Sequence, residues 1–289
     1  MPITPSPLRY PGGKSSLSNF LASVLCLNGL IGSTYVEPFC GGAGAAINLL
    51  LSKKVSNIIL NDIDPLIYSF WFSILNHTDD FIKKIELVSI NIAEWHKQRE
   101  ALYSDETSVF DKGFATFFLN RSNRSGILHA NPIGGIKQNG KWPIHSRFNK
   151  RSLIKKIEHI ALHKDNIVLK NNNAINFIKN YILNITEKMF IYYDPPYYSK
   201  GPSLYMNALS NEDHASLAAA IINDRKNIWL MTYDKAKDIK SLYSTVKMDS
   251  FKLNYSANKH KKGEEILIYP HHVKLPVNSI TPYYGSKIF

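Results

Sequence analysis

Apolar runs typical of buried strands alternate with helical segments in two separate parts of the chain. The first part contains expected strands at Thr34–Glu37 and Ser56–Leu60, each followed by an apolar helix. The second part contains expected strands at Ile167–Leu169, Met189–Tyr193 and Ile228–Thr232, again separated by helical segments. Strands connected through helices pair in parallel, because the chain must cross back over the sheet before it can pair again. We therefore predict an α/β fold with a mostly parallel sheet.

The stretch between these two parts has a different pattern. Helical segments are expected at Ile92–Tyr103 and Ser108–Asn120, and a glycine-rich stretch follows at Gly134–Gly140. No apolar run of strand character interrupts this stretch. We predict that residues 1–65 and 166–289 form one α/β domain, and that residues 66–165 are a mostly helical insertion with a basic loop or hairpin.

Capping residues mark the starts of two expected helices. Ser15 or Ser16 is expected to cap a helix that reaches Cys26, and Asp64 is expected to cap a helix over Pro65–Leu75. The remaining expected elements are helices at Ala174–Tyr181, Asn211–Ile222 and Lys235–Tyr243, and a closing strand at Glu265–Tyr269.

Composition narrows the class of protein and its surroundings. The chain has 289 residues, of which 44% are hydrophobic, so it can bury a substantial core. It contains no apolar run of about 18 residues, and residues 1–11 lack the features of a signal peptide, so we expect a cytoplasmic protein without a membrane partner. The two cysteines and the scattered histidines predict no disulfide and no metal site. The net charge of +12 favours a polyanionic partner, although a basic charge also serves solubility.

The run Asp194-Pro195-Pro196-Tyr197 follows the expected strand at Met189–Tyr193 and therefore lies at its carboxyl end. Open α/β sheets bind their ligands at that edge. The Asp194 carboxylate and the Pro195 carbonyl can accept hydrogen bonds from both N–H groups of an exocyclic amine, while Pro196 keeps the turn rigid. Tyr197 offers a flat face for an aromatic base. These residues predict catalysis at the amino group of a base, whereas a rigid turn is the structural alternative.

Two further runs have the residue types of a nucleotide-like cofactor site. Small residues at Gly41–Gly44 stand between an expected strand and a helix, where a ligand can approach the backbone closely. Asp62 ends the next expected strand, at the place where an acidic residue of Rossmann-like sites binds ribose hydroxyls. A tight turn is the alternative for the glycine run, and helix capping is the alternative for Asp62.

Taken together, these runs resemble the Dam-like group of adenine-specific DNA methyltransferases. The resemblance covers nearly the whole chain and rests on the order of its motifs. Those motifs are Leu8-Arg9-Tyr10-Pro11-Gly12-Gly13-Lys14, Tyr35-Val36-Glu37-Pro38-Phe39-Cys40-Gly41-Gly42, the insertion, Asp194-Pro195-Pro196-Tyr197-Tyr198 and the late run Gly263-Glu264-Glu265-Ile266-Leu267-Ile268. Where many members of the group have another glycine, this chain has Ala43.

The resemblance implies a fold, a cofactor and a set of site residues. The fold is a Rossmann-like S-adenosylmethionine-dependent methyltransferase sheet, and residues 66–165 are the target-recognition domain. The reaction is methyl transfer to N6 of an adenine flipped out of double-stranded DNA. The expected cofactor-binding residues are Tyr10, Lys14, Phe39, Gly41, Asp62 and Asp194, and the residues that hold the adenine are Asp194, Pro195, Pro196 and Tyr197.

Polar and basic residues of the insertion are the expected contacts to DNA. Arginine and lysine bind phosphate or guanine, and asparagine can read adenine. A solvated charged surface is the alternative for any single member of the set. The expected DNA-binding residues are Asn120, Arg121, Arg124, Lys137, Lys141, Arg147 and Lys150.

Other functions stay open at this point. Transfer to cytosine N4 uses similar chemistry, and a catalytically silent relative would keep only DNA binding. Methylation of a glutamine amide is disfavoured, because that class usually has asparagine at the position of Asp194. A cognate restriction enzyme is a candidate partner, and we expect the free protein to be a monomer.

Overall fold

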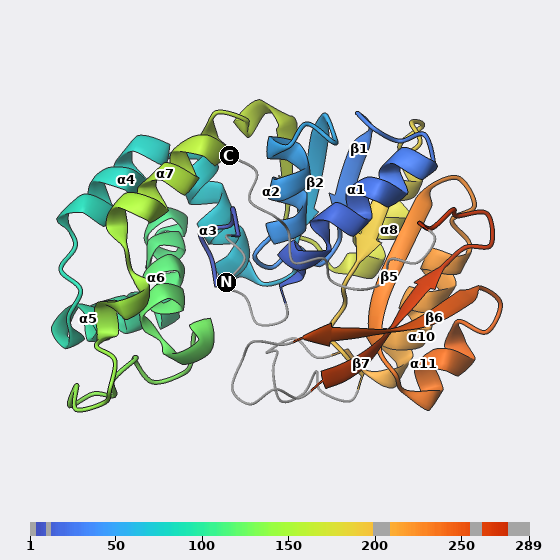
Figure 1. The fold of residues 1–289 in the computed structure, drawn as a ribbon. Helices are drawn as coiled ribbons and strands as arrows, with labels where there is room; N and C mark the ends of the chain where they lie inside the picture. Colours follow the sequence, from blue (N-terminus) through green and yellow to red (C-terminus); the bar gives the residue numbers. More distant parts are fainter. Residues whose placement is uncertain (1–3, 10–12, 199–208, 255–261, 277–289) are drawn as a thin grey trace.

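A single seven-stranded sheet organises the chain (Figure 1). The computed structural model describes residues 4–9, 13–198, 209–254 and 262–276. The strand order is β3-β2-β1-β4-β5-β7-β6. The strands are β1 (Thr34–Glu37), β2 (Asn57–Asn61), β3 (Ile167–Lys170), β4 (Phe190–Tyr193), β5 (Ile228–Asp234), β6 (Lys247–Asn254) and β7 (Lys262–Tyr269).

The sheet is parallel from β3 through β5, and β7 is antiparallel to both β5 and β6. The predicted α/β fold with a mostly parallel sheet is therefore confirmed. The chain builds outward from β1 through β2 to β3, and then returns to add β4 on the other side of β1. The strand order reverses between β1 and β4, and open α/β sheets bind their ligands at the carboxyl ends of strands at such a point.

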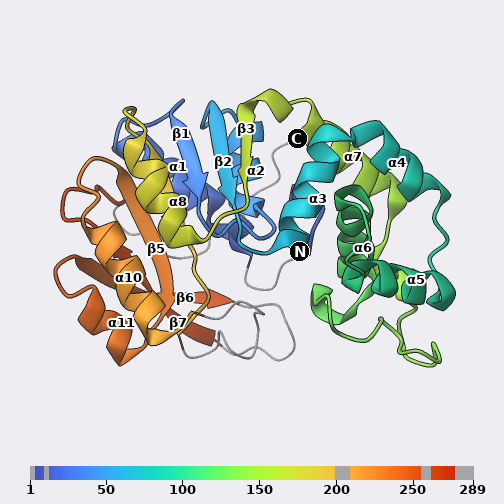
Figure 2. The ribbon, with the colours of Figure 1, turned by 180° about the vertical axis from the view of Figure 1, so that it is seen from behind.

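Helices cover both faces of the sheet, so the central strands β1, β4 and β5 are buried on both sides. Helices α1 (Ser18–Leu27) and α2 (Gly44–Leu51) cover one face, and α8 (Ala174–Asn180), α10 (Asn211–Ile222) and α11 (Lys237–Leu242) cover the other (Figures 1 and 2). Successive strand residues point to opposite faces. Tyr35 and Phe190 accordingly belong to one core cluster, while Val36 and Ile191 belong to the second.

A helical region lies beside the sheet and is inserted between β2 and β3 (Figure 1). Its helices α3 and α6 pack closely, with the rings of Phe70 and Phe117 stacked at 6.0 Å between centroids. The core cluster on the α2 face of the sheet continues without a break into this region. The helices are α3 (Pro65–Asn76), α4 (Thr78–Leu87), α5 (Ile92–Tyr103), α6 (Val109–Ser122) and α7 (Lys150–Ala161).

Helix starts agree with the predictions at one position and differ at another. Asp64 caps α3 and accepts a hydrogen bond from the Leu66 N–H at 2.8 Å, as expected. The expected caps at Ser15 and Ser16 are wrong, because these residues lie inside a 3₁₀ helix over Lys14–Leu17 that leads into α1. No helix within the described ranges is long and apolar enough to cross a membrane.

Candidate active site

Asp194 lies directly after the fully buried strand β4, at the carboxyl edge of the sheet. The Thr232 hydroxyl on the neighbouring strand β5 donates a hydrogen bond to Asp194 Oδ1 at 2.8 Å. Thr232 is oriented in turn by the Tyr192 hydroxyl, with 2.8 Å between the two oxygens. Adjacent parallel strands therefore fix the direction of the Asp194 carboxylate, which is only 23% exposed.

Lys14 brings the glycine turn of the N-terminal segment to this carboxylate. Its ammonium donates to Asp194 Oδ2 at 2.9 Å and to the Tyr197 hydroxyl at 3.0 Å. The side chain of Lys14 is 6% exposed, so the ion pair is shielded from water. The sequence prediction gave Lys14 to the cofactor. In the structure, its ammonium contacts the carboxylate of Asp194 and the hydroxyl of Tyr197.

Tyr197 is held from its hydroxyl end by a residue of the antiparallel strand β7. The hydroxyl donates to Glu265 Oε1 at 2.5 Å, and Glu265 is 2% exposed. Burial, together with the negative charges of Asp194 and Glu265, raises the pKa of Tyr197 well above its usual value. The phenol consequently stays protonated and keeps donating, which fixes the plane of its ring.

The loop after β1 forms a second part of the site, beside the end of β2. Asp62 Oδ2 accepts the Gly41 N–H at 2.8 Å, and Asp62 Oδ1 accepts the Asp64 N–H at 3.0 Å. The Trp71 indole donates to the Gly41 carbonyl at 2.9 Å. Burial raises the pKa of Asp62 to about 6. The predicted residues Gly41 and Asp62 are thus brought together at adjacent strand ends.

Glu37 ends β1 and supports the same loop from within. Its Oε1 accepts the Tyr35 hydroxyl at 2.9 Å and the Ala46 N–H at 3.1 Å. Burial raises the pKa of Glu37 to about 8. A protonated carboxyl group can still accept both hydrogen bonds, so Glu37 joins β1 to the start of α2 in either state.

Ala43 and Gly44 decide how closely the loop and the N-terminal segment approach each other. Ala43 has a φ of 45°, a left-handed conformation that glycine adopts more easily. A Cβ atom on Gly44 would lie 2.0 Å from the Ser15 hydroxyl oxygen. Gly44 therefore permits the contact that places the 3₁₀ helix, and with it Lys14, over the site.

The residues present fit an S-adenosylmethionine molecule at this edge. Residues 41–44 are three glycines and one alanine, so a ligand can approach their backbone closely. Asp62 can accept hydrogen bonds from ribose hydroxyls, and the half-buried Phe39 offers an apolar surface. Tyr10, the remaining predicted cofactor residue, lies outside the described residues.

The predicted DNA-binding residues fall into two groups in the structure. Arg124, Lys137, Lys141 and Arg147 are exposed in the segment that joins α6 to α7, and Arg121 is half-buried at the end of α6. The exposed ring of Trp142 lies 5.5 Å from the Lys141 ammonium.

Asn120 and Lys150 are engaged by the protein itself. Asn120 is 2% exposed, accepts the Arg9 N–H at 2.7 Å and donates to the carbonyls of Arg9 and Gly126. Lys150 donates to the carbonyls of Glu86 and Val88, both at 2.7 Å, at the end of α4. This placement does not fit a direct contact with DNA, and it gives both side chains a structural role.

Sequence reasoning did not identify Thr232 and Glu265 as residues of the site. Thr232 is 38 positions from Asp194, and Glu265 is 68 positions from Tyr197. Only the pairing of β4 with β5, and of β5 with β7, brings them to the same edge. The available signals were that both lie in expected strands and that Glu265 belongs to the late run that resembles the family.

The sheet, the glycine loop and the Asp194–Tyr197 turn together define a Rossmann-like S-adenosylmethionine-dependent methyltransferase. More particularly, residues 10–259 match the model of the D12 class N6 adenine-specific DNA methyltransferase family. The chain belongs to that family, whose description gives DNA as the substrate. A comparison with curated proteins found no match.

Solved structures with a similar arrangement share little sequence with this chain. A Listeria monocytogenes protein assigned to the class I S-adenosylmethionine-dependent methyltransferases is 11% identical, with a TM-score of 0.40. The alignment covers 92% of this chain and 65% of that protein. The rRNA methyltransferase AviRa from Streptomyces viridochromogenes is 12% identical over 90% of this chain and 86% of its own, with a TM-score of 0.38. TrmK from M. capricolum, solved with S-adenosylhomocysteine, is 10% identical over 87% of this chain and 71% of its own, with a TM-score of 0.35.

Proposed function

We propose that this protein methylates N6 of an adenine that is flipped out of double-stranded DNA into the site at the end of β4. The observation that carries the proposal is the fixed pair of Asp194 and Tyr197. Lys14 contacts both residues, and each is also held by a neighbouring strand, through Thr232 and Glu265 respectively. A duplex base cannot reach a carboxylate that is 23% exposed behind a strand end, so it must leave the stack.

The chemistry follows from what these residues can hold. Bound S-adenosylmethionine supplies a methyl group that is already activated on a sulfonium. An Asp194 oxygen accepts one N–H of the adenine amine, and the Pro195 carbonyl accepts the other, which turns the nitrogen lone pair toward that methyl group. As the nitrogen–carbon bond forms and the sulfur–carbon bond breaks, the Asp194 carboxylate stabilises the positive charge that develops on nitrogen, and one N–H proton of the amine then passes to solvent. The ring of Tyr197 stacks on the base.

Residues 66–165 supply the contacts to the duplex in this proposal. Trp142 is 61% exposed, and Lys137, Lys141 and Arg124 are exposed in the same connecting segment. Exposed aromatic rings among cations are typical of surfaces that bind nucleic acid, where the ring stacks on bases and the cations bind phosphates. The Dam-like subtype, a cognate restriction enzyme, a monomeric free state and a cytoplasmic location stay predictions from the sequence.

Replacement of the catalytic carboxylate tests the proposal. Asp194→Ala is expected to reduce methyl transfer by at least about 10³-fold, because it removes the main acceptor for the amine. The measurement is transfer of tritiated methyl groups to DNA, followed by digestion to nucleosides. The matched control is Asp105→Ala, which removes an exposed carboxylate of the insertion.

Two outcomes would contradict the proposal. One is retention of methyl transfer by Asp194→Ala with a normal melting temperature. The other is recovery of the label in N4-methylcytosine instead of N6-methyladenine, which would favour the cytosine reaction.

A further inference from the structure

The N-terminal segment crosses the end of α6 and brings one arginine to another. The Arg9 N–H donates to Asn120 Oδ1 at 2.7 Å, and Asn120 Nδ2 donates back to the Arg9 carbonyl at 2.8 Å. The Arg9 guanidinium donates from Nη1 to the carbonyl of Asn123 at 3.1 Å. Arg121 lies between these two asparagines in the sequence, so Arg9 is fixed at the same helix end as Arg121.

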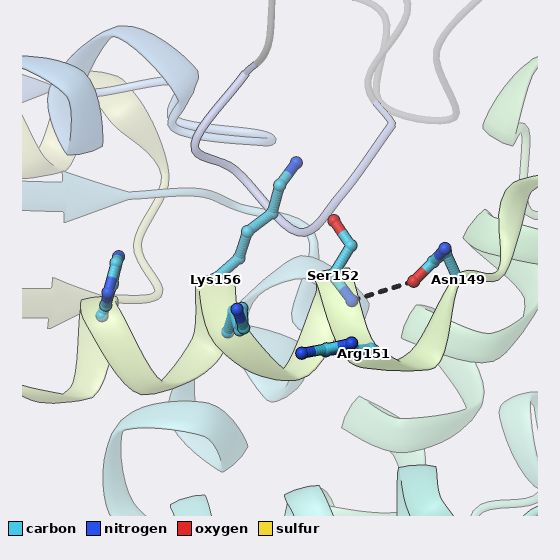
Figure 3. Close-up of a pocket in the computed structure, with 6 residues that line it drawn as sticks. Asn149, Arg151, Ser152 and Lys156 are labelled. Atoms are coloured by element: carbon cyan, nitrogen blue, oxygen red, sulfur yellow. Dashed lines mark hydrogen bonds between the residues drawn. The ribbon is translucent and has the colours of Figure 1, made fainter. Parts of the chain in front are cut away.

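Further contacts hold the segment in place from both sides. A Cβ atom on Gly126 would lie 2.5 Å from the Arg9 carbonyl oxygen, so the two backbones are in close contact. On the other side, Lys156 of α7 donates to the carbonyls of Thr4 at 2.6 Å and Ser6 at 3.3 Å. Figure 3 shows Lys156 pointing from α7 toward this segment. The position of Arg9 is therefore determined by packing, although its side chain is charged.

The charges at this helix end repel one another. Arg121 is half-buried, and its buried Nε atom has no hydrogen-bond partner among the residues that the structure describes. Burial, together with the positive charges of Arg9 and Arg147, lowers the pKa of Arg121 to about 10. Burial and Arg147 likewise lower the pKa of Arg9. Among the described residues, no carboxylate contributes to these shifts. A half-buried set of like charges is unfavourable unless an anion binds to it.

We propose that Arg9, Arg121 and Arg147 together bind one backbone phosphate of duplex DNA. This inference rests on the proposed function, since it assumes a DNA substrate. Guanidinium groups present several N–H donors in one plane and bind phosphate oxygens through paired hydrogen bonds. A phosphate at this point would accept the buried N–H of Arg121 and neutralise the repulsion of the three cations.

The proposed phosphate site also has a definite relation to the catalytic centre. Arg9 stands five positions before Lys14, whose ammonium contacts Asp194. The same short segment therefore carries one ligand of the DNA backbone and one partner of the catalytic carboxylate. A phosphate bound by Arg9 would hold the duplex in a fixed position relative to the site that receives the base.

Variants of the full-length chain test the proposal, with a duplex taken from DNA that the wild-type protein methylates. Arg121→Gln and Arg9→Gln are each expected to weaken DNA binding by about tenfold. Each should also lower the slope of log K against log salt by about one, and the affinity for S-adenosylmethionine should not change. Because both residues serve one phosphate, the double variant should lose much less than the product of the single losses.

The melting temperature of the free protein separates this role from a structural one. Arg147→Gln removes a cation from the cluster while its exposed side chain leaves the core intact. We expect this variant to melt at the same temperature as the wild type or higher. Its slope of log K for DNA binding against log salt should fall by about one, as in the other two variants. Lys155→Gln, an exposed cation on α7, is the matched control and should change DNA binding much less.

The outcomes distinguish this inference from the proposed function. An unchanged salt slope in all three arginine variants would overturn the inference, as would a lower melting temperature with DNA affinity retained. If the wild-type protein neither binds nor methylates DNA, the proposed function itself is wrong. Methyl transfer by the wild type, together with unchanged slopes in the variants, would leave the proposed function standing without this site.

Discussion

Charged side chains are arranged in opposite ways at the two functional regions of this molecule. At the end of β4, the buried ammonium of Lys14 lies 2.9 Å from the Asp194 carboxylate. At the end of α6, the nearby cations of Arg9, Arg121 and Arg147 repel one another, and the buried Nε atom of Arg121 has no hydrogen-bond partner within the described part of the chain. Among the described residues, the first region therefore pairs its charges and the second does not.

This difference corresponds to the ligands that the two regions are expected to bind. Adenine is neutral, and the site that holds it needs fixed acceptors and a flat surface, which an internally paired network provides before the base arrives. DNA phosphates are anions, and a set of cations without a counter-charge gains an ion pair only when DNA binds. In the free protein, repulsion among the three arginines lowers stability at the proposed DNA-binding end, whereas the charges of Lys14 and Asp194 are paired at the proposed catalytic end.

Removal of the paired cation is the strongest test of the catalytic half of the comparison. Lys14→Met is expected to lower kcat by about 10²-fold or more, because Asp194 and Tyr197 both lose a hydrogen-bond donor. Single-turnover methyl transfer would measure the effect. Lys14→Arg, which keeps the charge, should recover part of the rate. Full activity of Lys14→Met would show that the pairing has no catalytic consequence.

Removal of the contact between Tyr197 and Glu265 of β7 is expected to lower kcat by less than removal of Lys14 does. Glu265→Ala is expected to lower kcat by about tenfold or more, because the hydroxyl of Tyr197 loses its acceptor and the ring plane is no longer fixed. Glu265→Gln keeps an acceptor oxygen and should recover most of the rate. A positioning role predicts this rescue together with an unchanged affinity for the cofactor. Equal losses in both variants would instead point to the charge of Glu265.

Trp142 tests the DNA-binding half without altering any charge. Trp142→Ala is expected to weaken binding to duplex DNA by about tenfold, because a stacking ring is lost from the cationic segment. Its melting temperature should stay close to that of the wild type, since the ring is exposed. The control is Leu162→Ala, which removes an apolar side chain that is 79% exposed just after α7. Equal affinities of the two variants would argue against this placement of the DNA.

Glu37 provides the smallest expected effect, on stability alone. Its pKa is about 8 in the folded protein and 4.5 in the reference state, so the folded form binds the proton more tightly. The stability that it contributes is present below about pH 4.5 and is lost as the pH rises toward 8. Glu37→Gln should therefore melt at a higher temperature than the wild type at pH 8, with little difference near pH 4.5. A melting-temperature difference that does not change with pH would contradict the prediction.

The sequence predicted every strand in the interior of the sheet and the edge strand β3. The expected strand at Thr34–Glu37 coincides with β1, and the one at Met189–Tyr193 begins one residue before β4. These strands are buried on both faces, so their sequences are continuous apolar runs. Strand β6 was not predicted. It pairs on one side only, with β7, and its sequence alternates polar and apolar residues without a continuous apolar run.

The residues of the candidate site also differ in whether the sequence alone could identify their role. Asp194 and Tyr197 could be identified from the sequence because they are adjacent along the chain and follow a strand. The role of Asn120 could not, because an asparagine near arginines has the same pattern whether it contacts DNA or accepts a backbone N–H. Its partner Arg9 is 111 positions away, and only folding brings the two together.

The sequence by itself determined the alternation of the interior strands with helices, the Asp194–Tyr197 run that we propose carries the chemistry and the positive charge that favours DNA. Each of these depends on residues that are close along the chain or on composition. The tertiary structure alone decided that Lys14 contacts Asp194, that Thr232 and Glu265 hold Asp194 and Tyr197, and that the charges of three arginines act on one another near the end of α6. These contacts depend on which strands become neighbours and on where the N-terminal segment crosses the insertion, because hydrogen bonds and charge repulsion act through space and not along the chain.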